Sequence, residues 1–131
     1  KMTKMCDDLG FESLTIDILQ LSEDKKFDVV FGFDVLEHVL DLQAFKEKVN
    51  KIVNEWLVLQ VPVDRTMVPP NNYNRAEADS FDGHSHYFSV ASMSELFKDY
   101  FDIKQVFYGH RGKLARGPEI LCIFKKKEAS G

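Results

Sequence analysis

The sequence has few of the features that mark an extracellular, membrane-spanning or nucleic-acid-binding protein. Its 131 residues include only two cysteines, Cys6 and Cys122, far apart in dissimilar contexts, so a reducing cytoplasm fits better than a disulfide framework. No apolar run approaches the roughly 20 residues that cross a bilayer, and no secretory signal is visible. The net charge of -4 provides no broad basic surface for nucleic acid or an anionic membrane. We therefore expect a cytoplasmic protein with neither of these partners.

The composition favours one soluble globular domain that spans residues 1–131. The hydrophobic fraction is 44% and the charged fraction 29%, values that suit a folded core with a solvated surface. Eleven Phe and one Trp supply bulky core material. Position 1 is Lys rather than Met, which is compatible with a natural N-terminus upstream.

The most informative stretch runs from Phe27 to Val39. Its first part, Phe27–Phe33, is apolar and contains β-branched residues, a pattern typical of a strand buried on both faces. It then turns polar at Asp34, Glu37 and His38. In open α/β sheets, ligands bind just beyond the carboxyl ends of parallel strands, so this polar cluster lies where a site is expected. A buried strand followed by an ordinary polar loop is the plainer interpretation, and spacing alone favours it.

Hydrophobic spacing and turn residues predict the other elements of the chain. We expect helices over residues 2–9, 41–53 and 92–100, the last with Ser89 as an alternative N-cap. We expect further strands over residues 13–17, 56–61, 101–108 and 119–125. Residues 63–88 form a long irregular segment, which is typical of a functional lid or loop. The last two strands have no helix between them and should form an antiparallel hairpin.

This order of elements predicts an α/β fold. Strands that alternate with helices favour a Rossmann-like, mostly parallel sheet with helices on both faces. The C-terminal antiparallel β-hairpin adds one reversed strand, which makes the sheet mixed.

Two segments together resemble a known enzyme family. Phe27–Val30, running into the Asp-Val-Leu-Glu-His-Val sequence of residues 34–39, resembles the fourth-strand motif of class I S-adenosylmethionine-dependent methyltransferases. The similarity is to their small-molecule, ubiquinone-biosynthesis-like branch, and it extends to Gly83–Ser89 and the terminal hairpin. The family's Gly-rich loop after strand one, and the acid that ends strand two, have no counterpart here. The resemblance therefore implies a partial methyltransferase fold, the C-terminal portion, with only part of a cofactor site.

The resemblance implies S-adenosyl-L-methionine as the cofactor and assigns five residues to it. Asp17 would accept a hydrogen bond from the adenine amino group, and Ile18 would cover the ring. Phe33, Asp34 and Val35 would face the methionine end, where the acid could pair with an ammonium group. From chemistry alone, Asp17 could equally cap the next turn, and Asp34 could be a carboxylate favoured by a helix dipole.

Histidines are the candidates for proton chemistry, because imidazole titrates near neutral pH. We take as candidate bases His38 and His86, and as candidate substrate contacts His84, Tyr87 and Arg111. Each also has a structural interpretation: a hydrogen-bonded His, a loop anchor or a solvated basic turn. Asp82, His84 and His86 are metal-ligand types, but their spacing matches no strong zinc signature, so we expect no metal.

The resemblance implies an enzyme that transfers a methyl group to a small-molecule O, N or C nucleophile, and one that is incomplete in this chain. The alternative is a non-catalytic binding or assembly module on a methyltransferase-like scaffold. A different α/β nucleotide-binding enzyme, such as a dehydrogenase, fits the hairpin less well. Without the family's first two strands, Phe27–Phe33 has an exposed edge. We expect a homodimer, or pairing with a missing N-terminal segment, to cover it.

Overall fold

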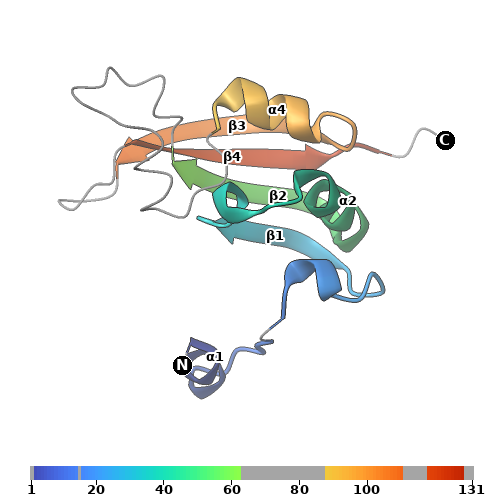
Figure 1. Ribbon diagram of the computed structural model, residues 1–131, viewed down its shortest axis with the longest axis vertical. Coiled ribbons are helices and arrows are strands. Elements are labelled where there is room, and N and C mark those ends of the chain that lie inside the picture. The colour runs from blue at the N-terminus through green and yellow to red at the C-terminus, as the bar shows by residue number, and fades with distance from the viewer. Residues whose placement is uncertain (1, 15, 63–87, 111–117, 129–131) are drawn as a thin grey trace.

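The computed structural model describes residues 2–14, 16–62, 88–110 and 118–128. The elements follow the predicted order closely (Figure 1). They are α1 (Met2–Asp8), η1 (Ile18–Gln20), β1 (Phe27–Phe33), η2 (Leu36–His38), α2 (Leu42–Ile52), β2 (Val53–Pro62), α4 (Val90–Phe97), β3 (Phe101–His110) and β4 (Pro118–Lys126).

The described strands form one four-stranded mixed sheet in the order β1-β2-β4-β3. β1 pairs with β2 in parallel, whereas β2–β4 and β3–β4 are antiparallel. The expected mixed α/β architecture and the closing hairpin are confirmed. Among the described elements, however, only the β1–β2 pair is parallel and the helices α2 and α4 cover one face, because the hairpin strands β3 and β4 make up half of the sheet. Central strand β2 joins the parallel side of the sheet to the antiparallel side, and β1 forms one edge.

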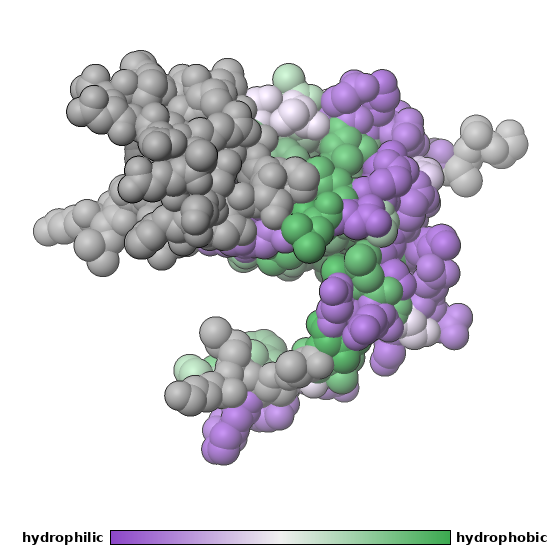
Figure 2. Space-filling model, in the orientation of Figure 1, coloured by the Kyte–Doolittle hydropathy of each residue, from purple (hydrophilic) through white to green (hydrophobic). Residues whose placement is uncertain are grey.

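The strand expected over residues 13–17 does not form. Ser13, Leu14, Ile16 and Asp17 lie in irregular backbone, and the side chains of Leu14 and Ile16 are exposed. A strand needs a neighbour to satisfy its backbone groups, and none of the described strands pairs with this segment. In Figure 1 the segment leads away from β1 towards α1, and Figure 2 shows a notch between this N-terminal part and the body of the molecule.

Strand β1 was expected to be buried on both faces, and this expectation is wrong. Val29, Phe31 and Phe33 share one face and are 41%, 62% and 50% exposed. Gly32, on the opposite face, is buried. Within the described chain β1 pairs only with β2, so it is an edge strand with one apolar face in contact with solvent.

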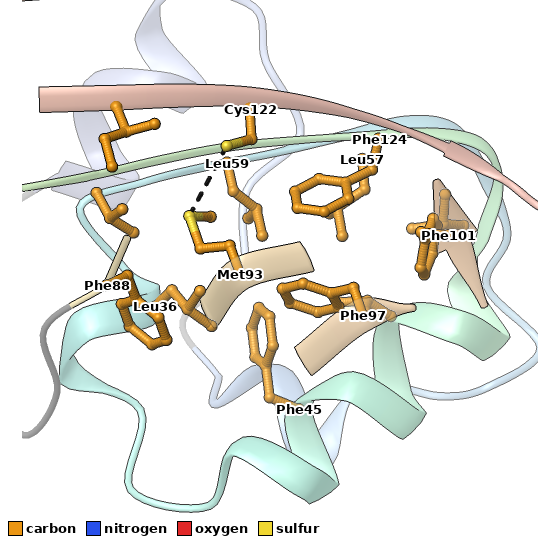
Figure 3. Close-up of a cluster of buried hydrophobic side chains, with 14 of the residues drawn as sticks. Leu36, Phe45, Leu57, Leu59, Phe88, Met93, Phe97, Phe101, Cys122 and Phe124 are labelled. Atoms are coloured by element: carbon orange, nitrogen blue, oxygen red, sulfur yellow. Dashed lines mark hydrogen bonds between the residues drawn. The ribbon is translucent and has the colours of Figure 1, made fainter. Parts of the chain in front are cut away.

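The hydrophobic core lies between the sheet and the helices α2 and α4, which pack on the same side of it (Figures 1 and 3). Phe97 of α4 is fully buried and makes edge-to-face contacts with Phe45, Phe101 and Phe124. The ring centroids are 6.5, 6.2 and 5.1 Å from that of Phe97. Each such pair adds about 0.5–1.5 kcal/mol beyond area burial. These rings fix how both helices sit on the sheet.

Helix α1 ends at Asp8, close to the predicted end of the helix over residues 2–9, and Gly10 follows it as the stop. The φ angle of Gly10 is +87°, in the left-handed region that favours glycine. The N–H of Phe11 donates to the Cys6 carbonyl at 2.9 Å, and the N–H of Gly10 donates to the Asp7 carbonyl at 3.0 Å. These two bonds are the Schellman motif.

Helix α2 begins at the predicted N-cap and runs into β2 without a loop. The Asp41 side chain accepts a hydrogen bond from the Ala44 N–H at 3.0 Å. The helix ends at Ile52 and the strand begins at Val53, whose carbonyl accepts a hydrogen bond from Lys126 Nζ at 2.9 Å. A lysine at this point complements the negative end of the helix dipole.

Helix α4 begins at Ser89, the alternative N-cap. The Ser89 side chain accepts from the Ser92 N–H at 3.1 Å, and Ser92 Oγ accepts from the Ser89 N–H at 2.9 Å. This reciprocal capping box starts the helix earlier than residue 92 and brings Met93 and Phe97 to the core side.

Candidate functional site

The face of β1 that carries Gly32 opens into a pocket of about 680 Å³. This volume lies within the range of roughly 300–1,000 Å³ typical of small-molecule sites. Its wall is largely apolar, with Asp17, His38 and Asp41 as its ionisable members. The other lining residues are Ile16, Ile18, Leu19, Val30, Phe31, Gly32, Val35, Val39, Leu40, Phe45, Leu57 and Leu59. The pocket therefore includes the corner beyond a parallel strand, where ligands of α/β sheets bind.

Gly32 contributes to the pocket wall without a side chain, so the pocket reaches the backbone of β1 at this position. A Cβ atom at this position would lie only 2.8 Å from Leu59 Cδ2. Leu59 is 1% exposed and borders both the core and the pocket, so a displaced Cδ2 methyl group would disturb one or the other. A side chain at position 32 would therefore disturb the wall or the core behind it.

Asp17 caps the short helix η1 and also lines the pocket. Its Oδ1 accepts a hydrogen bond from the Leu19 N–H at 2.9 Å. The capping role weighed from the sequence is therefore real. Because a carboxylate has two oxygens that each accept more than one bond, the cap leaves capacity for a ligand. Ile18, the next residue, packs against the core and lines the same pocket.

The chain turns sharply at Asp34, directly after β1. The φ angle of Asp34 is +55°, and its N–H donates to the Gln60 carbonyl at 3.1 Å. A non-glycine residue in the left-handed region costs roughly 1–2 kcal/mol, and aspartate tolerates it better than most residues. The turn directs the chain from β1 into η2, whose N-cap is Val35.

Phe33 points away from the pocket. Successive side chains of a strand alternate between faces, so Phe33 lies opposite Gly32. Its ring is 50% exposed and lies 5.7 Å from that of Phe31, centroid to centroid. Of the five residues predicted to bind the cofactor, the pocket brings together Asp17, Ile18 and Val35. Phe33 and Asp34 are not among its lining residues.

Glu37 and His38 form a pair in η2 with very different exposure. Glu37 is 1% exposed, whereas the His38 side chain is 45% exposed and lines the pocket. His38 Nε2 lies 3.6 Å from Glu37 Oε1. Burial raises the pKa of the Glu37 carboxyl, partly offset by a backbone hydrogen bond and by the nearby His38. The sequence analysis named His38 but not Glu37 as a candidate base, and nothing in the local pattern signals a buried carboxylate.

The other predicted site residues lie outside the described residues: His84, His86, Tyr87 and Arg111, together with Asp82 of the metal alternative. Their roles remain predictions. In the described parts of the chain, no three His, Cys, Asp or Glu side chains gather as metal ligands do. None of the helices in those parts has the length and apolarity needed to cross a membrane.

Comparison with known proteins establishes the fold. No family model matches the sequence, and no curated protein matches it. Among solved structures, the chain is similar to the N-methyltransferase NodS from Bradyrhizobium japonicum WM9 in complex with S-adenosyl-L-homocysteine, with 15% identity and a TM-score of 0.70. It is also similar to magnesium protoporphyrin IX methyltransferase from Synechocystis PCC 6803 with bound S-adenosyl-L-homocysteine (15% identity, TM-score 0.67). An S-adenosylmethionine-dependent methyltransferase from Thermotoga maritima matches at 17% identity and a TM-score of 0.73.

These matches cover almost the whole of this chain but only part of the solved structures. They cover 97%, 96% and 97% of this chain, but 62%, 57% and 69% of the three solved chains. The chain thus spans less than two thirds of NodS and of the Synechocystis enzyme. Its fold is a partial class I methyltransferase fold, as the sequence motif implied.

Proposed function

We propose that this chain is part of a cytoplasmic enzyme that transfers a methyl group from S-adenosyl-L-methionine to a small-molecule acceptor. One observation carries the proposal: a pocket beyond β1 is lined by Asp17, Ile18, Val35 and His38. The family resemblance expects three of these four at the cofactor, and the chemistry of imidazole makes the fourth, His38, a candidate base. The methyltransferase fold supports the proposal, and two of the similar structures hold S-adenosyl-L-homocysteine.

The residues at the pocket fit one side of this cofactor. The Asp17 carboxylate is an acceptor suited to an amino group, and Ile18 offers an apolar surface for an aromatic ring. Val30 and Leu59 supply apolar walls that exclude water. When bound, the cofactor supplies an electrophilic methyl group on its sulfonium sulfur. We propose Asp34 and Val35 near its methionine end, where Phe33, whose side chain lies on the opposite face of β1, would contribute only backbone atoms.

The residues that we propose at the acceptor substrate come from the sequence alone, because they lie outside the described residues. We propose His84, Tyr87 and Arg111 as substrate contacts and His86 as a second base beside His38. The family's Gly-rich loop has no counterpart in these residues, so the chain alone should bind the cofactor only weakly. In the complete enzyme the missing wall would come from another segment.

Titration with S-adenosyl-L-homocysteine tests the proposal. We expect millimolar ligand to shift the backbone amide signals of Ile18, Val35 and His38 in ¹⁵N NMR spectra. Asp17→Ala should weaken this response, whereas Asp17→Asn retains an acceptor oxygen and the helix cap. Asp102→Ala, in β3 and away from the pocket, is the matched control.

Two results of this titration would count against the proposal. Unchanged signals at the pocket residues would refute cofactor binding here. Micromolar binding measured by calorimetry would refute the idea that the site is incomplete.

The open edge of β1 favours a second candidate, a methyltransferase-like assembly module. Val29, Phe31 and Phe33 form an exposed apolar row on a strand that, among the described strands, pairs on one side only. Such edges pair with other chains, so we propose a homodimer or pairing with an N-terminal segment. Sedimentation equilibrium of the wild type and of Phe31→Lys tests the homodimer. A monomeric wild type would refute the homodimer. If that monomer also fails to bind the cofactor analogue, pairing of the β1 edge with an N-terminal segment remains as the role of this edge.

A further inference from the structure

Glu37 is a buried acid whose presence the packing does not require. It is 1% exposed, and among the described residues its Oε2 atom has no hydrogen-bond partner. A buried carboxylate with an unsatisfied oxygen is costly, and an apolar or amide side chain of similar volume would usually be more stable. An acid retained at such a place, directly behind a pocket, calls for a functional explanation.

The fold holds Glu37 and the exposed His38 in one rigid turn. Leu36 is fully buried and anchors η2 in the core. The turn is closed by the His38 N–H, which donates to the Val35 carbonyl at 3.0 Å, and by the Val39 N–H, which donates to the Leu36 carbonyl at 3.1 Å. In this turn Glu37 Oε1 lies 3.6 Å from His38 Nε2, and the imidazole lines the pocket.

We propose that Glu37 is a positioning residue that orients His38 and stabilises its protonated form when His38 accepts a proton from the acceptor substrate. This inference rests on the proposed function and adds a second member to its proton-transfer machinery. The arrangement is the one used wherever an acid orients an imidazole base: the carboxylate faces one ring nitrogen, and the other nitrogen takes the proton.

The proposed proton transfer accounts for each bond that breaks and each bond that forms. With the imidazole proton on Nε2, facing Glu37, the lone pair that accepts a proton is on Nδ1. The O–H or N–H bond of the acceptor breaks, its proton forms a bond to His38 Nδ1, and its electron pair stays on the acceptor atom for attack on the methyl carbon. The resulting imidazolium then lies beside the Glu37 carboxylate, which offsets its charge.

Two neighbouring residues shift the pKa of Glu37 in opposite directions, and each provides a test of the proposal. His38 lowers the pKa of Glu37, whereas Glu119 of β4 raises it. Gln60 of β2 donates a hydrogen bond to Glu119 through its side-chain amide, so both sheet strands contribute to this environment. Removal of His38 should therefore move the Glu37 titration in one direction, and removal of Glu119 should move it in the other.

Carboxyl ¹³C NMR of the full chain, in the absence of cofactor, measures this coupling. We expect the Glu37 midpoint to rise in His38→Gln and to fall in Glu119→Gln. A Glu37 midpoint that is unchanged in His38→Gln would overturn the proposal. Because no cofactor is present, this failure is distinct from a failed S-adenosyl-L-homocysteine titration.

Discussion

Replacing Gly32 with alanine tests how tightly β1 is packed at the pocket. The new Cβ would meet Leu59 Cδ2 at 2.8 Å, closer than side-chain atoms normally approach. Overpacking of this kind costs about 1–3 kcal/mol. Alanine also removes the extra freedom of a strand glycine in the unfolded chain, which offsets about 0.5–1 kcal/mol. We therefore expect Gly32→Ala to lower the free energy of unfolding by about 1 kcal/mol.

Urea unfolding followed by circular dichroism measures this change. With a slope of about 1–3 kcal/mol per molar urea, a loss of about 1 kcal/mol lowers the midpoint by roughly 0.3–1 M. Gly109→Ala in β3 is the matched control, because a Cβ there meets no atom within 4 Å. The control should unfold at the wild-type midpoint or slightly above it. Equal midpoints for the two variants would refute the packing argument.

A second substitution identifies the atom responsible. Leu59→Val removes Cδ2, so the double variant Gly32→Ala/Leu59→Val should be more stable than the sum of the single losses predicts. Contacting residues typically show coupling of about 0.5–3 kcal/mol. Simple additivity would mean that Leu59 is not the residue that the new methyl group displaces.

Three further predictions concern a helix cap, a buried acid and the two thiols. Asp41→Ala removes the side-chain acceptor of the Ala44 N–H and should lower the free energy of unfolding in urea by about 1 kcal/mol. Asp41→Ser keeps a capping oxygen and should retain most of the wild-type stability. Because burial raises the pKa of folded Glu37, its favourable contribution is present at low pH and is lost as pH rises through the folded pKa. Glu37→Gln should thus be more stable than the wild type at pH 7.5, with a difference that shrinks on acidification; a pH-independent difference would contradict this. Burial raises the pKa of Cys122 to about 11, so iodoacetamide at pH 8 should alkylate the half-buried Cys6 first, and equal rates for both would show otherwise.

The sequence predicted the strand Phe27–Phe33 correctly but not its surroundings. An apolar pattern says which side chains favour burial, not whether another element is present to cover them. Val29 and Phe31 fit a doubly covered strand, yet they are exposed because the described helices α2 and α4 lie on the opposite face. The strand expected over residues 13–17 is absent for the same reason: strand propensity cannot supply a pairing partner.

The burial of Lys46 in helix α2 depends on contacts with residues that are distant in the sequence. Helical spacing places Lys46 on the outer face, but its side chain is buried and contacts residues that follow α4. Its Nζ donates to Asp99 Oδ2 at 3.2 Å and lies 5.9 Å from the centroid of the Tyr100 ring. The aliphatic stem covers apolar surface while the ammonium group reaches a partner 53 residues along the chain. Local periodicity contains no information about such a partner.

The candidate site was predictable to the extent that a motif defined it. Asp17, Ile18, Val35 and His38 were named from the sequence, and the structure places all four on one pocket. The burial of Glu37 could not be foreseen, because it depends on how η2 packs against β2. The predicted residues between 82 and 87, and Arg111, lie outside the described residues.

Because α2 runs directly into β2, the directions of the helix side chains and of the strand side chains are fixed relative to each other. Helix side chains advance by about 100° per residue and strand side chains by 180°, so one inserted residue cannot be absorbed where no loop exists. An insertion after Ile52 would turn Leu57, Leu59 and Val61 from the helix-covered face to the opposite face, or rotate α2 away from the core. The stretch before α2, where Leu40 is 86% exposed, has no such constraint. Changes in chain length are therefore tolerated on one side of this helix and forbidden on the other.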